Sequence, residues 1–162
     1  MTERFVLESI GHVVGGRFEV EDDDWGAVEC TIRLDHARAD AAMVEGLTAF
    51  SHLEVVFRFD RVDEAGVEWG ARHPRGNRDW PRVGILAQRA KDRPNRIGLS
   101  RCELLGVDGV DLRVRGLDAV DGTPVLDIKP WMTGFAPRSA VREPDWAAAL
   151  MRGYWSDPSG RG

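Results

Sequence analysis

Two short stretches of the sequence gather residue types that bind charged groups. The first runs from Arg89 to Ser100 (RAKDRPNRIGLS) and carries Arg89, Arg93 and Asn95 around Pro94. A turn stiffened by proline that holds two guanidinium forks and an amide suits a carboxylate, a phosphate or a base edge. The competing interpretation is a basic turn that pairs with acidic side chains nearby.

The second stretch runs from Gly116 to Pro130 (GLDAVDGTPVLDIKP) and places carboxylates beside a turn and on the strand expected after it. Gly122 and Pro124 fix the shape of the turn. Its carboxylates either serve a ligand or accept hydrogen bonds from backbone N–H groups as in an Asx turn. The charged side chains concerned are Asp118, Asp121, Asp127 and Lys129.

Short elements must position these residues, because 18 glycines and 8 prolines in 162 residues interrupt the chain often. Hydrophobic patterns predict strands over 5–14, 28–34, 53–59, 83–87, 99–107, 110–115 and 126–129. They also predict a helix capped by Asp40, with Met43, Leu47 and Phe50 in the core, and a second helix from Pro144 to Gly153. This pattern indicates one mostly β domain, either a barrel or a sandwich. Strand–helix alternation and the glycine motifs of Rossmann and P-loop folds are missing.

Charge is divided unevenly along the chain. The formal net charge is −5, yet the window from Arg72 to Arg101 holds nine basic and two acidic residues. Interleaved His73, Asn77 and Trp80 give this window the mixture that a single-stranded RNA or phosphate surface uses. A solvated basic face is the alternative.

Several classes of protein are disfavoured. Cys30 and Cys102 form no CxxC pair, and the four histidines show no metal-ligand spacing, so we expect two reduced, buried thiols and no metal site. No stretch resembles a membrane span or a signal peptide, which predicts a cytoplasmic protein with no membrane partner.

Taken together, the two stretches resemble the signature of the TsaA-like (TrmO) family of tRNA methyltransferases. The resemblance covers roughly residues 5–135 and rests on three segments that occur in family order and spacing. They are GLTAFSHLEVVFRF (46–59), VGILAQRAKDRPNRIGLS (83–100) and GLDAVDGTPVLDIKP (116–130).

The resemblance implies a small closed β-barrel of six to seven short strands with two or three short helices. It further implies a homodimer that binds S-adenosylmethionine close to its interface and methylates N6 of threonylcarbamoyladenosine, in the anticodon stem-loop of tRNA. We expect a barrel domain over residues 1–140, and a short helix and tail over 141–162 packed on or beside it.

The same resemblance implies roles for individual residues. The cofactor would be held by Asp60, Arg61, Arg89, Leu99, Asp118, Ala119, Val120 and Asp121, although the family usually has a histidine where Asp60 stands. RNA would be bound by Arg93, Asn95, Arg96 and Lys129. Asp127 or Asp121, with Lys129, are our candidates for the catalytic groups, and Asp127 as proton acceptor competes with a purely structural Asp127–Lys129 pair.

One departure from the family pattern keeps other functions open. Family members usually carry Pro-Arg-Gln after the first strand, where this chain has Phe18-Glu19-Val20-Glu21-Asp22. Added acid beside a cofactor carboxylate or an RNA phosphate weakens binding. The alternatives are therefore a divergent paralogue that binds S-adenosylmethionine but acts on another substrate, and a noncatalytic RNA-binding barrel.

Overall fold

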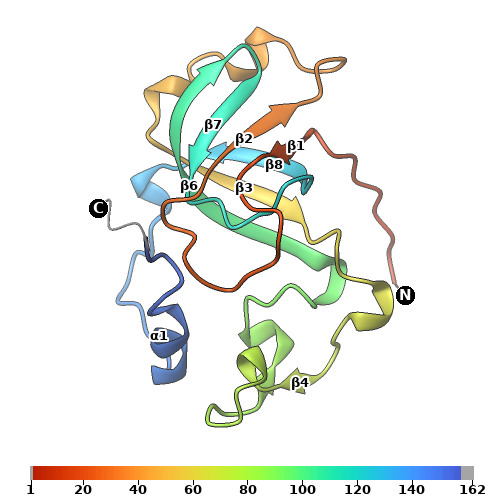
Figure 1. The fold of residues 1–162 in the computed structure, drawn as a ribbon, viewed down its shortest axis with the longest axis vertical. Coiled ribbons are helices and arrows are strands. Elements are labelled where there is room, and N and C mark those ends of the chain that lie inside the picture. The colour runs from red at the N-terminus through yellow and green to blue at the C-terminus, as the bar shows by residue number, and fades with distance from the viewer. Residues whose placement is uncertain (1, 158–162) are drawn as a thin grey trace.

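The computed structural model describes residues 2–157, and its central feature is a closed antiparallel barrel (Figure 1). Around the barrel the strands follow the order β1-β2-β7-β6-β3-β8. The closed barrel confirms the expected fold and decides between the barrel and the sandwich that residue patterns left open. The strands are β1 (Gly11–Val14), β2 (Glu29–Leu34), β3 (His52–Arg58), β6 (Ile97–Asp108), β7 (Asp111–Arg115) and β8 (Pro124–Pro130).

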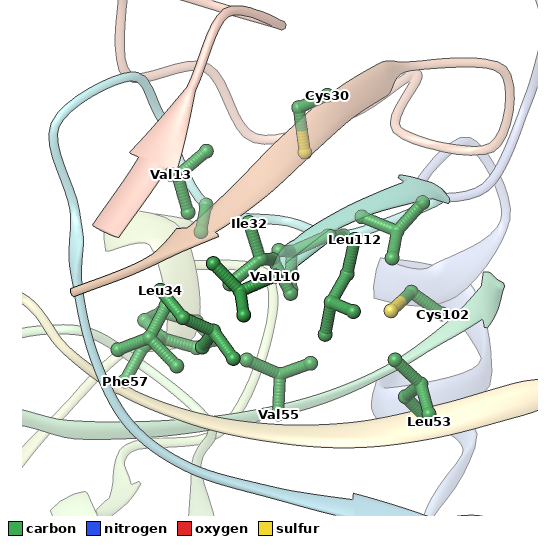
Figure 2. Close-up of a cluster of buried hydrophobic side chains, with 14 of the residues drawn as sticks. Val13, Cys30, Ile32, Leu34, Leu53, Val55, Phe57, Cys102, Val110 and Leu112 are labelled. Carbon is green, nitrogen blue, oxygen red and sulfur yellow. The ribbon is translucent and has the colours of Figure 1, made fainter. Parts of the chain in front are cut away.

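Alternation along the strands fills the barrel with apolar side chains (Figure 2). In β3, Leu53, Val55 and Phe57 point inward and are at most 2% exposed. Each such side chain contributes about 1.5–3 kcal/mol when it is fully buried. Cys30 and Cys102 lie in the same core as free thiols, as expected.

The hairpin between β6 and β7 has the predicted turn. Asp108 pairs with Asp111, and Gly109 takes a left-handed φ of 60° between the strands. Asp-Gly favours such tight turns because both residues tolerate positive φ.

The segment between β3 and β6 lies outside the barrel, below it in Figure 1. Two short strands there, β4 (Ala71–Arg72) and β5 (Val83–Gly84), pair only with each other. The buried strand predicted over 83–87 is wrong, because Ile85–Ala87 forms a 3-10 helix and Leu86 is 77% exposed. Since β8 pairs with both β1 and β3, the barrel has no open edge to accept another strand.

The first predicted strand begins later than expected, at Gly11. Phe5, Val6 and Leu7 are 65–87% exposed. Gly11 pairs with Leu34, the last residue of β2, so residues before Gly11 extend past the end of their neighbour.

The predicted helix after Asp40 is two short 3-10 helices, Ala41–Val44 and Leu47–Ala49. Asp40 caps the first by accepting from the backbone N–H of Ala42, as expected. Gly46 has a φ of 81° between them and ends the helical run, so Met43 is 56% exposed and Val44 is buried instead. Further 3-10 helices are Glu64–Gly66, Pro74–Gly76, Pro94–Arg96 and Thr133–Phe135.

The one α-helix of the described residues, α1 (Asp145–Met151), starts after Pro144 as predicted. Its residue Trp146 lines a cleft together with residues 79–81, among them Trp80. Residues 158–162 of the predicted tail lie outside the described residues. Within residues 2–157, no helix is long and apolar enough to cross a membrane.

Candidate functional site

The segment between β7 and β8, residues 116–123, holds two of the predicted cofactor carboxylates at the barrel wall. Leu117 and Ala119 are buried and anchor the segment, which leaves Asp118 and Asp121 at its polar positions. The backbone N–H of Gly15 donates to Oδ1 of Asp121 at 2.7 Å. The Asp121 carboxylate therefore caps a backbone group more than one hundred residues away, rather than its own turn.

Arg61 ties the end of β3 to the same segment. Its Nη2 donates to the backbone oxygen of Asp121 at 3.0 Å, and its Nη1 donates to the backbone oxygen of Phe18. Asp60, beside it, is exposed. The structure thus brings together Arg61 and Asp121, which the family resemblance had placed in one cofactor site.

Asp118 contacts a residue that the sequence did not single out. The hydroxyl of Tyr154 donates to Oδ2 of Asp118, while Oδ1 is buried and has no hydrogen-bond partner within residues 2–157. A buried acceptor without a partner costs about 1–3 kcal/mol. Burial, and secondly the charge of Asp118, raise the pKa of Tyr154 well above its ordinary value.

Arg89 and Leu99 also lie together. Nη2 of the exposed Arg89 donates to the backbone oxygen of Leu99. The positive charge of Arg89 opposes the rise in the pKa of Tyr154. Arg89 and Leu99 thus form one contact, and Tyr154 and Asp118 form another.

Asp127 and Lys129 lie on the outer face of β8 and form an ion pair. Oδ1 of Asp127 also accepts from the backbone N–H of Ile128 at 2.9 Å. The contact expected of a structural pair is present, and a catalytic role for Asp127 stays a prediction. Val56 of β3 pairs with Asp127 on one side and with Leu99 on the other.

The predicted RNA-binding arginines hold their own loop. Nη1 of Arg93 donates to the Gln88 backbone oxygen at 2.8 Å, and Nη1 of Arg96 donates to the Val62 backbone oxygen at 2.6 Å. Asn95 is exposed with a left-handed φ of 63°. Arg93 and Arg96 therefore stabilise the fold of the loop, a role that residue types alone did not predict.

Other basic side chains lie on the surface and, within the described residues, make no hydrogen bond to the backbone of this loop. Arg78, Arg82 and Lys91 are exposed. Arg101 stacks on the ring of Trp131 at 3.3 Å and pairs with Glu54 at 3.0 Å. Across residues 2–157 no cluster of His, Cys, Asp and Glu side chains could hold a metal ion.

Comparison with known proteins gives a family for most of this barrel. A family model described as "tRNA-methyltransferase O N-terminal domain" matches residues 23–136. A tRNA (adenine(37)-N6)-methyltransferase of Escherichia coli K12 is 48% identical over 101 residues, which cover 59% of this chain and 41% of that protein. The chain therefore spans less than half the length of that relative.

Two further proteins match more of the chain. A probable S-adenosyl-L-methionine-binding protein of Methanothermobacter thermautotrophicus is 44% identical over 116 residues, covering 72% of this chain and 74% of that protein. A crystal structure of TrmO from Pseudomonas aeruginosa superposes with a TM-score of 0.69 at 27% identity, covering 86% of this chain and 62% of that one.

Proposed function

Because the chain belongs to the tRNA-methyltransferase O N-terminal domain family, we propose that it is an S-adenosylmethionine-dependent tRNA methyltransferase. We propose as its target N6 of threonylcarbamoyladenosine, the modified base beside the anticodon. The observation that carries the proposal is that the proposed cofactor residues meet in two contacts, Arg89 with Leu99 and Arg61 with Asp121 of the segment that also holds Asp118. These residues come from four separate parts of the chain.

The side chains present fit S-adenosylmethionine. The cofactor offers a carboxylate, an ammonium group and a ribose diol, which need a guanidinium and carboxylate acceptors. Arg89 supplies the guanidinium, and Asp118 supplies an oxygen whose hydrogen-bonding capacity is unused. Asp60, Arg61, Ala119, Val120 and Asp121 complete the proposed cofactor residues.

When bound, the cofactor supplies an activated methyl group, so the main task of the protein is to orient the acceptor nitrogen and exclude water. Methyl transfer to N6 would require this nitrogen to release a proton. We assign Asp127 as the acceptor of that proton, because its row of the outer face also contains Leu99. Lys129 holds the Asp127 carboxylate in place, and Asp121 is the second candidate for the proton acceptor.

The basic surface is the proposed contact with the anticodon stem-loop. Exposed Arg78, Arg82 and Lys91 reach phosphate oxygens through solvent-facing charges. The Arg101–Trp131 stack on the outer barrel face offers a platform for a base. Asn95 and Lys129 belong to the same proposed surface, with Arg93 and Arg96 shaping the loop that carries Asn95.

A homodimer is part of the proposal, with the cofactor site near its interface. Leu99 is 47% exposed and Ile97 is 38% exposed on β6, and Leu86 is 77% exposed on the segment before it. Apolar side chains exposed on the outer face of a strand and on a neighbouring loop are buried well against a second copy of the chain.

The second candidate is a divergent paralogue that binds S-adenosylmethionine but methylates another substrate. Two observations favour it: the guanidinium groups of Arg93 and Arg96 are used inside their loop, and the net charge is −5. A noncatalytic RNA-binding barrel would keep the basic surface and lack cofactor affinity.

Calorimetric titrations with S-adenosylmethionine and with tRNA separate these functions. The variants are Arg89→Ala and Asp118→Ala. The proposal predicts saturable binding by the wild-type protein and weaker binding by both variants. Binding without affinity for tRNA would favour the paralogue, and affinity for tRNA without cofactor binding would favour the RNA-binding barrel.

A further inference from the structure

The segment after α1 packs onto the connection between β1 and β2 through backbone contacts. The backbone N–H of Asp24 donates to the Gly153 oxygen at 3.0 Å, and that of Trp25 donates to the Tyr154 oxygen at 2.9 Å. A Cβ atom on Gly26 would lie 2.1 Å from the Trp155 oxygen. The glycine therefore permits a close approach that any other residue would block.

Side-chain contacts then fix the ring of Tyr154. Arg75 lies 5.9 Å from its ring centroid and forms an ion pair with Asp23 at 2.8 Å. The ring of Trp155 packs edge-to-face against the ring of Tyr154, with ring centroids 4.9 Å apart. Because both the backbone and the ring are held, the direction of the Tyr154 hydroxyl is fixed as well.

That hydroxyl binds only one of the two Asp118 oxygens. Oδ2 accepts from Tyr154, and Oδ1 lies buried without a partner in the described part of the chain. A carboxylate anchored through one oxygen presents the other in a fixed direction, and a buried acceptor gains more from a new donor than a solvated one.

We propose that Tyr154 is a positioning residue of the cofactor site, whose hydroxyl orients Asp118 so that Oδ1 accepts a hydrogen bond from a donor of S-adenosylmethionine. This inference rests on the proposed function. The family model matches residues 23–136, which include Asp118 but not Tyr154. The match to the family model therefore does not account for the Tyr154–Asp118 contact. Tyr154 acts through Asp118 and takes no part in the methyl transfer itself.

The test compares the affinity for S-adenosylmethionine of the wild-type protein, Tyr154→Phe and Ser156→Ala by calorimetry. Tyr154→Phe keeps the ring and removes only the hydroxyl, and Ser156→Ala removes an exposed hydroxyl two residues further on. We expect Tyr154→Phe to bind about 10-fold more weakly, as for the loss of one hydrogen bond to a charged group. Ser156→Ala is expected to bind like the wild type.

A spectroscopic signature tests the contact independently of binding. Tyr154 is the only tyrosine of the chain, so protein labelled at tyrosine Cζ with carbon-13 gives one tyrosine signal. We expect this signal to move when Asp118 is replaced in Asp118→Asn, and to move again when the wild-type protein is saturated with S-adenosylmethionine. A tyrosine that contacts Asp118 for structural reasons alone would give the first shift and not the second.

The outcomes distinguish failure of the role of Tyr154 from failure of the proposed function. If the wild-type protein binds S-adenosylmethionine and Tyr154→Phe binds equally well, only the role of Tyr154 is overturned. Tighter binding by Tyr154→Phe would also overturn it, because Tyr154 would then compete with the cofactor for Asp118. A Tyr154 signal unmoved by Asp118→Asn would refute the contact, and no binding by the wild-type protein would refute the proposed function together with this role.

Discussion

Leu99 and Asp127 are paired with the same residue, Val56, from opposite sides of strand β3. Adjacent strands lie about 4.8 Å apart, so the two residues are separated by roughly 10 Å across one face of the barrel. Leu99 also accepts a hydrogen bond from Arg89 through its backbone oxygen. Leu99, a proposed cofactor residue, and Asp127, the proposed proton acceptor, therefore lie in one row across the outer face of the sheet.

Asp127→Asn should lower the rate of methyl transfer and leave cofactor affinity unchanged. Asparagine keeps the shape of the side chain but cannot accept the proton from N6, and general-base catalysis contributes about 100-fold or more to such rates. Single-turnover rates and calorimetric affinities measured on the same preparation check both parts.

Asp108→Asn, in the turn between β6 and β7, is the matched control because it removes an exposed carboxylate from a hairpin that does not pair with β8. The assignment fails if Asp127→Asn turns over as fast as this control. In that case the Asp127–Lys129 pair is structural only.

Asp121→Ala should lower the free energy of unfolding by about 1–2 kcal/mol, because the Gly15 N–H loses its acceptor. Asp121→Asn keeps an amide oxygen in that place and should lose less than half as much. Urea unfolding of the three proteins measures the difference. Equal losses in both variants would show that charge, rather than the hydrogen bond to Gly15, is what the barrel requires.

The two core thiols predict how stability changes in alkali. Burial raises the pKa of Cys30 and of Cys102 from 9.0 to about 12. Between these values the unfolded chain loses thiol protons that the folded protein keeps, so the free energy of unfolding falls as pH rises from about 9 to about 12. The fall reaches up to about 1.4 kcal/mol per pH unit for each thiol.

Urea unfolding of wild type and Cys30→Ala between pH 8 and pH 10.5 isolates this contribution. The variant has one thiol fewer to titrate, so its stability should fall less steeply above pH 9. Parallel curves for the two proteins would show that the thiols are not the source of the alkaline loss.

Arg78→Ala and Arg82→Ala should weaken tRNA binding without lowering the melting temperature, because both side chains are exposed. Each lost phosphate contact reduces the dependence of log affinity on log salt concentration by about one. Arg93→Met should instead lower the melting temperature, since it removes the donor to the Gln88 oxygen. Arg93 would instead contact tRNA directly if Arg93→Met melts like the wild type and weakens tRNA binding with the same loss of salt dependence as Arg78→Ala.

The sequence predicted the barrel strands that alternate in hydrophobicity, such as β3, and the Asp-Gly hairpin, because both signals are local. It failed at residues 83–87, where apolar composition suggested a strand but the closed barrel offers no edge. Within the site, Arg61 and Asp121 were expected together, and they meet. Tyr154 was missed because its contact with Asp118 depends on how the segment after α1 folds back onto residues 24–26, which no periodic pattern encodes.

The most direct test of the central claim is a single-turnover assay with S-adenosylmethionine that carries a labelled methyl group. The substrates are tRNA containing threonylcarbamoyladenosine beside the anticodon and the same tRNA with unmodified adenosine there. The account predicts that label enters the modified tRNA at N6 and that Arg89→Ala and Asp118→Ala reduce the transfer. Cofactor binding without any transfer to the modified tRNA would contradict it.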